Sequence, residues 1–205
     1  MQGYITNINK ARDEDLIITI LTPRKQYTTY RFYGARHSTI NLGYKIDFEL
    51  QHSFKSKIPQ LRSVLHLAKR WNIDRIRMYI WQQFVKFFYK HLKDIENIEE
   101  FYFKLLEESF EKWGEQNPKR IAIECYIKLL EFEGRLHSDF ICFECEKKIE
   151  KDISLLRAFL PAHKECIYTD SYKLAHVKEL FKNKTTLFFD DKEIERLWQI
   201  LCEGF

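Results

Sequence analysis

The sequence predicts an α+β protein in which a five-stranded barrel over residues 1–70 precedes an α-helical domain over residues 71–205. Three observations lead to this prediction. The first seventy residues contain about five short runs of strand character. After Trp71 the apolar residues recur at steps of three and four, which is typical of amphipathic helices. Late in the chain, Cys and His at ligand spacing predict a metal knuckle at about 140–168.

The clearest strand signal is YKIDFEL at 44–50, which alternates strictly between apolar and charged residues. Tyr44, Ile46, Phe48 and Leu50 share one face, so we expect a half-buried strand.

Four further runs complete the strand set. Residues 15–22 are nearly all apolar, which predicts burial on both faces, and residues 26–34 are rich in Tyr, Thr and Phe. Pro23 between them indicates a hairpin loop. The runs 3–8 and 60–67 bring the total to five. Five strands without an intervening helix favour an OB-fold barrel over an open sheet with exposed edges.

The helical part is predicted from periodicity and helix-start signals. A first helix of about twenty residues has an expected apolar face of Ile73, Ile76, Ile80, Phe84, Phe87/Phe88 and His91. A second runs from about Glu99 to Trp113. The pair Asn117-Pro118 opens a third, because Pro is tolerated at the first helical position. Two short helices follow, at about 170–182 and 190–203.

The metal pattern has the form C-x2-C-x17-H-x2-C, and its four ligands are Cys142, Cys145, His163 and Cys166. Three thiolates and one imidazole can close a tetrahedron around one Zn²⁺ ion. Because all four positions are filled, we interpret the zinc as structural rather than catalytic. The segment between the two pairs is expected to be a helix or an extended linker. Cys125 and Cys202 lie in apolar helical patterns and are expected in the core.

No catalytic constellation accompanies this pattern, and we expect a protein that is not an enzyme. The sequence has no phosphate-binding Gly-rich loop and no nucleophile elbow. Charged residues interrupt the longest apolar stretches, so we expect no membrane association. The start of the chain lacks a signal-peptide pattern, and five Cys do not form a disulfide framework. These features predict a cytoplasmic protein.

The charge distribution points to a polyanion partner. The formal net charge is +4, yet residues 1–80 hold 14 Lys/Arg and only 6 Asp/Glu. Single-strand binders combine such cations with aromatic platforms for bases. The alternative, that the aromatic residues fill the barrel core and the cations only solvate it, stays open. The cations and the interleaved aromatics are Lys10, Arg12, Arg24, Lys25, Arg31, Arg36, Lys45, Lys55 and Lys57, with Tyr27, Tyr30, Phe32 and Tyr33.

The first forty residues resemble the amino terminus of the RecO family of bacterial recombination mediators. That family opens with M-x-G, continues with an acidic-Leu-aliphatic strand ending in Leu-Thr, and carries a strand ending in G-A-R. The corresponding pieces here are Met1-Gln2-Gly3, Asp15 to Thr22 and Gly34-Ala35-Arg36. The order of barrel, helices and late zinc site matches as well. This chain differs in having His163 where the family usually has Cys, and Tyr33 where it usually has a basic residue.

The resemblance implies a DNA repair and homologous recombination mediator. Such proteins bind single- and double-stranded DNA and anneal complementary strands. They help to load the recombinase together with RecR onto DNA coated with single-stranded-DNA-binding protein (SSB). It also implies a nucleoid-associated place in the cytoplasm. On this interpretation the expected DNA-binding residues are Arg24, Lys25, Arg31, Arg36 and Lys45.

Two other functions stay open at this stage. One is a zinc-containing protein-interaction scaffold with no direct DNA binding. A strong salt dependence of DNA binding would distinguish the mediator from the scaffold, which should show none. The other is a metal hydrolase, which would need an open zinc position and a nearby general base.

Overall fold

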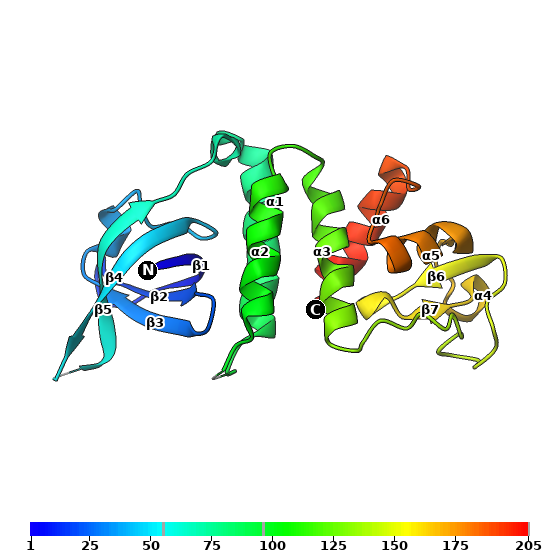
Figure 1. Ribbon diagram of the computed structural model, residues 1–205, viewed down its shortest axis with the longest axis horizontal. Helices are drawn as coiled ribbons and strands as arrows, with labels where there is room; N and C mark the ends of the chain where they lie inside the picture. Colours follow the sequence, from blue (N-terminus) through cyan, green and yellow to red (C-terminus); the bar gives the residue numbers. More distant parts are fainter. Residues whose placement is uncertain (55, 96, 205) are drawn as a thin grey trace. The chain divides into compact units, whose positions relative to one another are not determined.

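The computed structural model describes residues 1–54, 56–95 and 97–204 of the chain. The chain divides into two compact units, Met1–Gly114 and Glu115–Phe205. The first unit contains a closed five-stranded barrel and two long helices, and the second contains helices and a small sheet (Figure 1). Within the described residues, no helix is both long and apolar enough to cross a membrane.

The barrel is the OB-fold predicted from the strand pattern. Its strand order is β1-β2-β3-β5-β4, and every neighbouring pair is antiparallel except β3 with β5, which meet in parallel at Tyr30 and Gln60. The strands are β1 (Gln2–Lys10), β2 (Leu16–Leu21), β3 (Gln26–Arg31), β4 (Lys45–Ser53) and β5 (Ser56–His66).

The alternation of β4 places its apolar residues inward as predicted. Ile46 and Phe48 are buried in the barrel core, and Tyr44 and Leu50 pack against it with partial burial. The strand β2 is buried along almost its whole length, which confirms the prediction from its apolar run. The barrel core therefore follows from the sequence pattern.

Two helices pack in the same unit as the barrel: α1 (Arg75–His91) and α2 (Glu100–Lys112). The predicted domain boundary near residue 70 coincides with the change from strands to helices, while the compact unit continues to Gly114. The division into domains 1–70 and 71–205 thus stays a prediction. The expected apolar face of α1 was wrong at its start, because Ile73 and Ile76 are 89% and 73% exposed. The buried face begins instead at Met78 and continues through Trp81 and Phe84.

An aromatic cluster joins the barrel to the helices. The Tyr4 ring from β1 lies 5.9 Å from the ring of Trp81 and 5.5 Å from that of Phe110. Trp81 Nε1 donates a hydrogen bond to the carbonyl of Gly43 at 2.7 Å. Gly43 has φ +81°, and a Cβ there would lie 2.8 Å from the Trp81 ring. Only glycine suits both the turn and this close approach.

A polar triad lies beside this cluster. The Lys45 ammonium forms an ion pair with Glu107 of α2, and Tyr4 Oη donates to the second oxygen of that carboxylate at 3.1 Å. Burial and the charge of Glu107 raise the pKa of Tyr4, so the phenol stays protonated and donates. The triad therefore satisfies a charge pair and a hydroxyl that the packing has largely removed from water.

The second unit contains α3 (Pro118–Phe132), α5 (Leu174–Asn183) and α6 (Asp191–Cys202) around a small sheet. The sheet has the order β7-β6-β8, with β6 (Asp152–Leu155) between β7 (Pro161–Ala162) and β8 (Tyr172–Lys173). As predicted, Asn117 caps α3 by accepting a hydrogen bond from the Lys119 N–H, with Pro118 at the first helical position. The segment expected as a helix or extended linker contains β6. Cys125 is buried as expected, whereas Cys202 is exposed, because it ends α6 on the solvent side.

We expect Glu107→Ala to lower the free energy of unfolding of the first unit by about 2–4 kcal/mol. The reason is that Lys45 and Tyr4 would keep their partly buried polar groups without their shared acceptor. Urea unfolding followed by tryptophan fluorescence measures this, because Trp71, Trp81 and Trp113 all lie in this unit. The exposed Glu99 of the same unit provides the control, and Glu99→Ala should cost less than about 1 kcal/mol. Equal losses for the two variants would contradict the importance of the triad.

Candidate metal centre and candidate nucleic-acid surface

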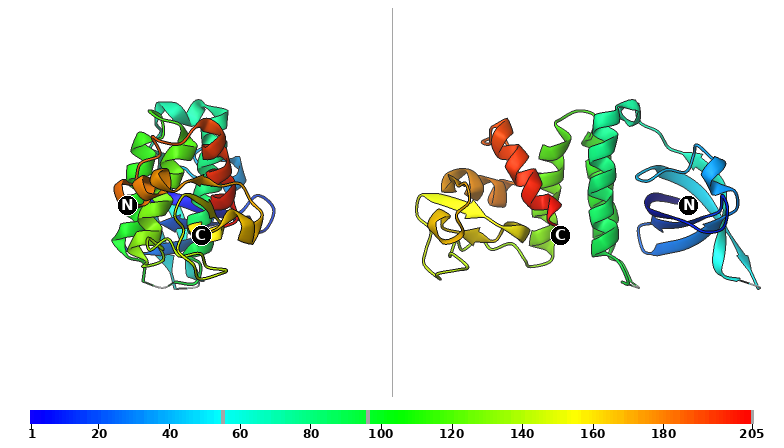
Figure 2. Two further views of the ribbon diagram at one scale, coloured as in Figure 1. Left: turned by 90° about the vertical axis from the view of Figure 1, so that its right-hand side faces the viewer. Right: turned by 180° about the vertical axis from the view of Figure 1, so that it is seen from behind.

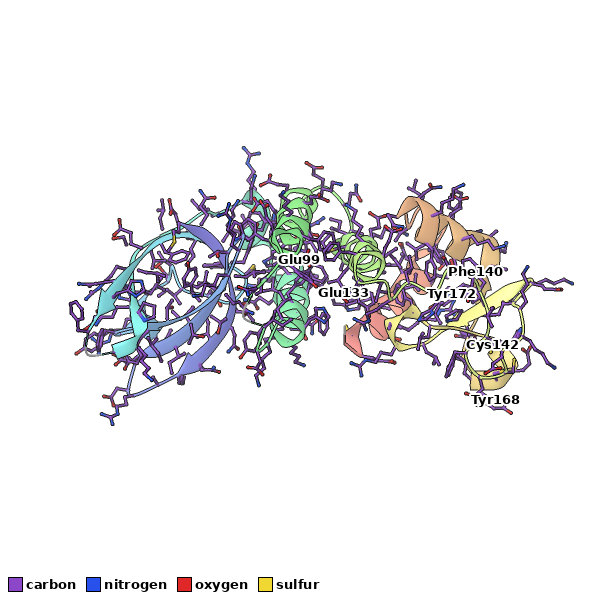
Figure 3. All side chains as sticks on the ribbon, turned by 60° about the horizontal axis from the view of Figure 1, so that its bottom comes forward. Glu99, Glu133, Phe140, Cys142, Tyr168 and Tyr172 are labelled. Carbon is purple, nitrogen blue, oxygen red and sulfur yellow. The ribbon has the colours of Figure 1, made fainter. Side chains whose placement is uncertain are left out.

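The four predicted metal ligands lie together in the second unit. The ligand atoms of Cys142, Cys145, His163 and Cys166 are all within 4.8 Å of one another. A tetrahedral Zn²⁺ with bonds of about 2.3 Å to sulfur and about 2.0 Å to nitrogen would separate its ligands by about 3.5–3.8 Å. The group could therefore hold a metal ion. Figure 3 labels Cys142 in this part of the chain.

A tight turn brings the first Cys pair together. The Ile141–Lys148 bridge closes it, and the Cys142 N–H donates to the Lys147 carbonyl at 2.9 Å. Glu146 N–H returns a bond to the Cys142 carbonyl at 2.9 Å, with Glu146 in the left-handed region at φ 58°. This turn leaves both sulfurs on one side, as a CxxC knuckle requires.

The second pair lies at the start of a short helix. His163 is the residue before α4 (Lys164–Ile167), and Cys166 lies on that helix. Because β7 ends at Ala162, pairing of β7 with β6 fixes where His163 stands. The Phe143 N–H donates to the Pro161 carbonyl at 3.0 Å, which ties the first knuckle to β7. Sheet and turn together thus place ligands that are far apart in sequence.

The electrostatics of the group suit thiolate ligation. Burial raises the pKa of the Cys142 thiol, but hydrogen bonds from the backbone N–H groups of Cys145, His163 and Glu144 outweigh it and lower that pKa to about 6. Burial and the neighbouring sulfurs of Cys145 and Cys142 raise the pKa of Cys166 to about 11. A divalent cation bound among the three sulfurs would offset the repulsion between their thiolate charges, because it coordinates the thiolate form.

The ligand set also limits the chemistry of the centre. Three sulfurs and one imidazole nitrogen supply all four positions of a tetrahedral ion and leave none for water or substrate. His163 Nδ1 lies 3.3 Å from the Cys145 sulfur, so the ring nitrogen faces the thiols. The nearby carboxylates Glu144, Glu146 and Glu165 are exposed to solvent. This arrangement is typical of a metal that stabilises the fold.

The predicted DNA-binding residues of the barrel occupy different environments. Arg24 and Lys25 are exposed in the turn between β2 and β3, where the Thr22 N–H donates to the Lys25 carbonyl at 3.0 Å. The Lys25 ammonium lies 5.5 Å from the centre of the Tyr27 ring. Both cations can reach a ligand in solvent.

Arg31 lies at the parallel seam between β3 and β5. One of its terminal nitrogens donates to the Leu61 carbonyl at 2.8 Å, and its buried Nε has no hydrogen-bond partner among the described residues. Burial and the nearby charge of Arg62 lower the pKa of Arg31. The structure thus places Arg31 near a second cation, Arg62, which is exposed and which the sequence analysis did not select. The sequence feature that could have identified Arg62 is its position within residues 50–73, which contain no Asp or Glu.

Arg36 lies in the 3-10 helix Gly34–Arg36 that follows β3. Its guanidinium stacks 5.2 Å from the centre of the Tyr33 ring and forms an ion pair with Glu14. Its side chain is 65% exposed, so the pair is open to water and competes weakly with a phosphate. Arg36 therefore remains accessible.

Lys45 differs from the other four. Its side chain is only 13% exposed, and its ammonium is paired with Glu107 and lies 5.9 Å from the centre of the Phe110 ring. The geometry gives Lys45 a role inside the unit. A DNA contact at Lys45 is therefore the least supported of the five predicted contacts.

We expect Cys142→Ser and Cys166→Ser to reduce bound metal from one ion per chain to substoichiometric levels and to lower the Tm of the second unit. Each kcal/mol lost from a domain of 60–100 residues lowers Tm by about 4–8 °C. Elemental analysis and thermal unfolding measure the two effects. Cys202→Ser is the matched control, because Cys202 is exposed and outside the group. Full metal content in Cys142→Ser would contradict this assignment.

Comparison with known proteins adds one finding. The family model described as RecO N terminal matches residues 1–72, which contain the whole five-stranded barrel. No curated protein matches the chain. The match supports a relation of this part of the chain to the RecO family, and it suggests a role in recombination and repair.

Proposed function

We propose that this protein is a RecO-like mediator of DNA repair and homologous recombination. The observation that carries the proposal is the coincidence of the RecO N-terminal match with a closed OB-fold barrel that carries accessible cations. RecO proteins are mediators rather than enzymes, and the filled ligand set of the metal group is consistent with such a role. The proposed place of action is the nucleoid in the cytoplasm.

The proposed activity is binding of single- and double-stranded DNA and annealing of complementary strands. Arg24, Lys25, Arg31 and Arg36 would contact phosphates, which gives affinity with little sequence preference. Neutralising two backbones lowers their repulsion while the bases stay free to pair. Base pairing, rather than the protein, would then select the correct partner strand.

The proposed partners are RecR and SSB, with which the protein would help to load the recombinase. The proposed cofactor is one Zn²⁺ ion held by Cys142, Cys145, His163 and Cys166. Zinc suits a set of three sulfurs and one imidazole nitrogen that lie within 4.8 Å of one another. Its role would be to hold the two knuckles of the second unit together.

A protein-interaction scaffold without DNA binding is the second candidate. The observation that favours it is a set of exposed apolar residues just before α1 and in its first two turns. Ile73, Ile76 and Tyr79 are 89%, 73% and 62% exposed. Exposed apolar groups of this kind are common at protein-binding surfaces.

We expect affinity for single-stranded DNA to fall with salt, because binding releases counterions from the neutralised phosphates. The variant Arg31→Gln/Arg36→Gln should reduce the slope of log affinity on log salt by about 1.4, from about 0.7 for each lost phosphate contact. Fluorescence anisotropy over a salt series measures the slope.

The control for this experiment removes two exposed lysines outside the barrel, as Lys104→Gln/Lys192→Gln, and keeps the same total charge as the test variant. The control should keep the wild-type slope. If wild type does not bind at low salt, the DNA role is wrong and the scaffold takes its place. Equal slopes for control and test variant would move the DNA site away from Arg31 and Arg36.

A further inference from the structure

The tip of the β4–β5 hairpin carries an exposed phenylalanine. The strands pair as far as Ser53 with Ser56, so Phe54 lies in the connecting turn, and its exposed fraction is 114%. Turns of this length favour Gly, Asn and Asp, which adopt the required backbone conformations. A phenyl ring adds nothing to such a turn and is fully in contact with water. Its presence there calls for an explanation outside the folded chain.

The outer part of the hairpin also lies outside the barrel core. The core includes Phe48 of β4 and Leu61 of β5, whereas residues 51–54 and 56–58 are all exposed. The hairpin can be followed beyond the other strands of the barrel in Figure 1 and again from behind in Figure 2. Phe54 is therefore presented to solvent at the end of a two-stranded ribbon.

The β5 side of the hairpin carries only positive charge, while Glu49 on β4 lies opposite Arg62. Residues 50–73 contain five Lys/Arg and no Asp or Glu. Lys57 and Arg62 are exposed on β5, while Lys55 lies outside the described residues. Arg62 neighbours Arg31 at the seam with β3, and Phe32, the residue that follows β3, is 47% exposed. Cations and exposed rings thus follow one another from the tip to the seam.

We propose that Phe54 stacks on an unpaired base of a single-stranded nucleic acid whose phosphates contact Lys57 and Arg62. The inference rests on the proposed function and names the part of the barrel that would hold the single strand. An exposed ring offers every base a π-face, and neighbouring cations neutralise the backbone. In a duplex the bases already stack on one another, so the contact favours single strands over double strands.

The test compares full-length wild type with Phe54→Leu and Phe54→Trp. Leucine keeps an apolar side chain without a ring, and tryptophan keeps a ring. The ligands are a short labelled oligothymidylate and an abasic oligonucleotide of equal length, which has the same phosphates and no bases. We expect Phe54→Leu to lose about 5-fold to 150-fold in affinity for oligothymidylate, the range for one stacked base. Affinity for the abasic strand should not change, and Phe54→Trp should bind both strands as wild type does.

The outcomes separate this inference from the proposed function. If wild type binds neither strand at low salt, the proposed function fails. If wild type binds oligothymidylate with the expected salt dependence and Phe54→Leu binds it equally well, the hairpin inference is overturned and the proposed function stands. Equal losses by Phe54→Leu on both strands also overturn stacking, because the abasic strand has nothing to stack. Since Phe54 packs in no core, an unchanged Tm in both variants verifies their folding.

A phenylalanine among lysines also suits an anionic membrane surface. Vesicles of phosphatidylserine and phosphatidylcholine therefore form the last arm of the experiment. The proposal is overturned if wild type binds these vesicles and Phe54→Ser does not, while both bind the oligonucleotide equally well. In that case the ring contacts a membrane. Absence of vesicle binding together with the selective loss on oligothymidylate supports it.

Discussion

The first unit depends on the joint at which Tyr4, Lys45 and Glu107 meet beside the contact of Trp81 with Gly43. A closed barrel has no free sheet edge for a helix to cover, so α1 and α2 must pack on side chains that the barrel offers. The aromatic rings supply the apolar area, and the triad satisfies the polar groups that this packing buries. Gly43 permits the contact because any side chain there would collide with the Trp81 ring.

The same strand connects this joint to the surface proposed for nucleic acid. β4 begins at Lys45, which is held by α2, and ends at Ser53 beside the exposed hairpin tip. Eight steps of about 3.3 Å separate these residues by about 26 Å along the strand. Anchoring at one end therefore leaves the other end free for a ligand.

The small sheet of the second unit needs a different kind of support. Strands β7 and β8 have only two residues each, so their own hydrogen bonds are too few to hold them. A metal tying His163 and Cys166 to the first knuckle would supply that support.

Much of the fold and of the metal centre could be predicted because the signals are local. Ile46 and Phe48 face the core because a strand alternates, and Asn117 caps α3 because an Asn-Pro pair suits a helix start. Short spacing within each ligand pair likewise predicts a knuckle. What could not be predicted depends on distant partners. Lys45 is an ordinary strand cation until Glu107, 62 positions later, pairs with it. Ile76 keeps helical spacing but lies in the first turn of α1, outside the buried face.

The number of Lys and Arg in residues 1–80 therefore exceeds the number of cations available to a nucleic acid, because some of them form ion pairs within the protein. Lys45 is bound to Glu107, Lys69 pairs with Glu111 at 2.6 Å, and the amino terminus pairs with Asp47 at 2.9 Å. These contacts compensate charge inside the unit. Arg62 instead donates to the side-chain amides of Gln51 and Gln60, and its partner in the β4–β5 register is Glu49. Within residues 50–73, which include β5 and the tip of its hairpin, Lys and Arg are thus present without any Asp or Glu. A polyanion would be drawn to this part of the barrel more than to the basic residues counted over the whole front half.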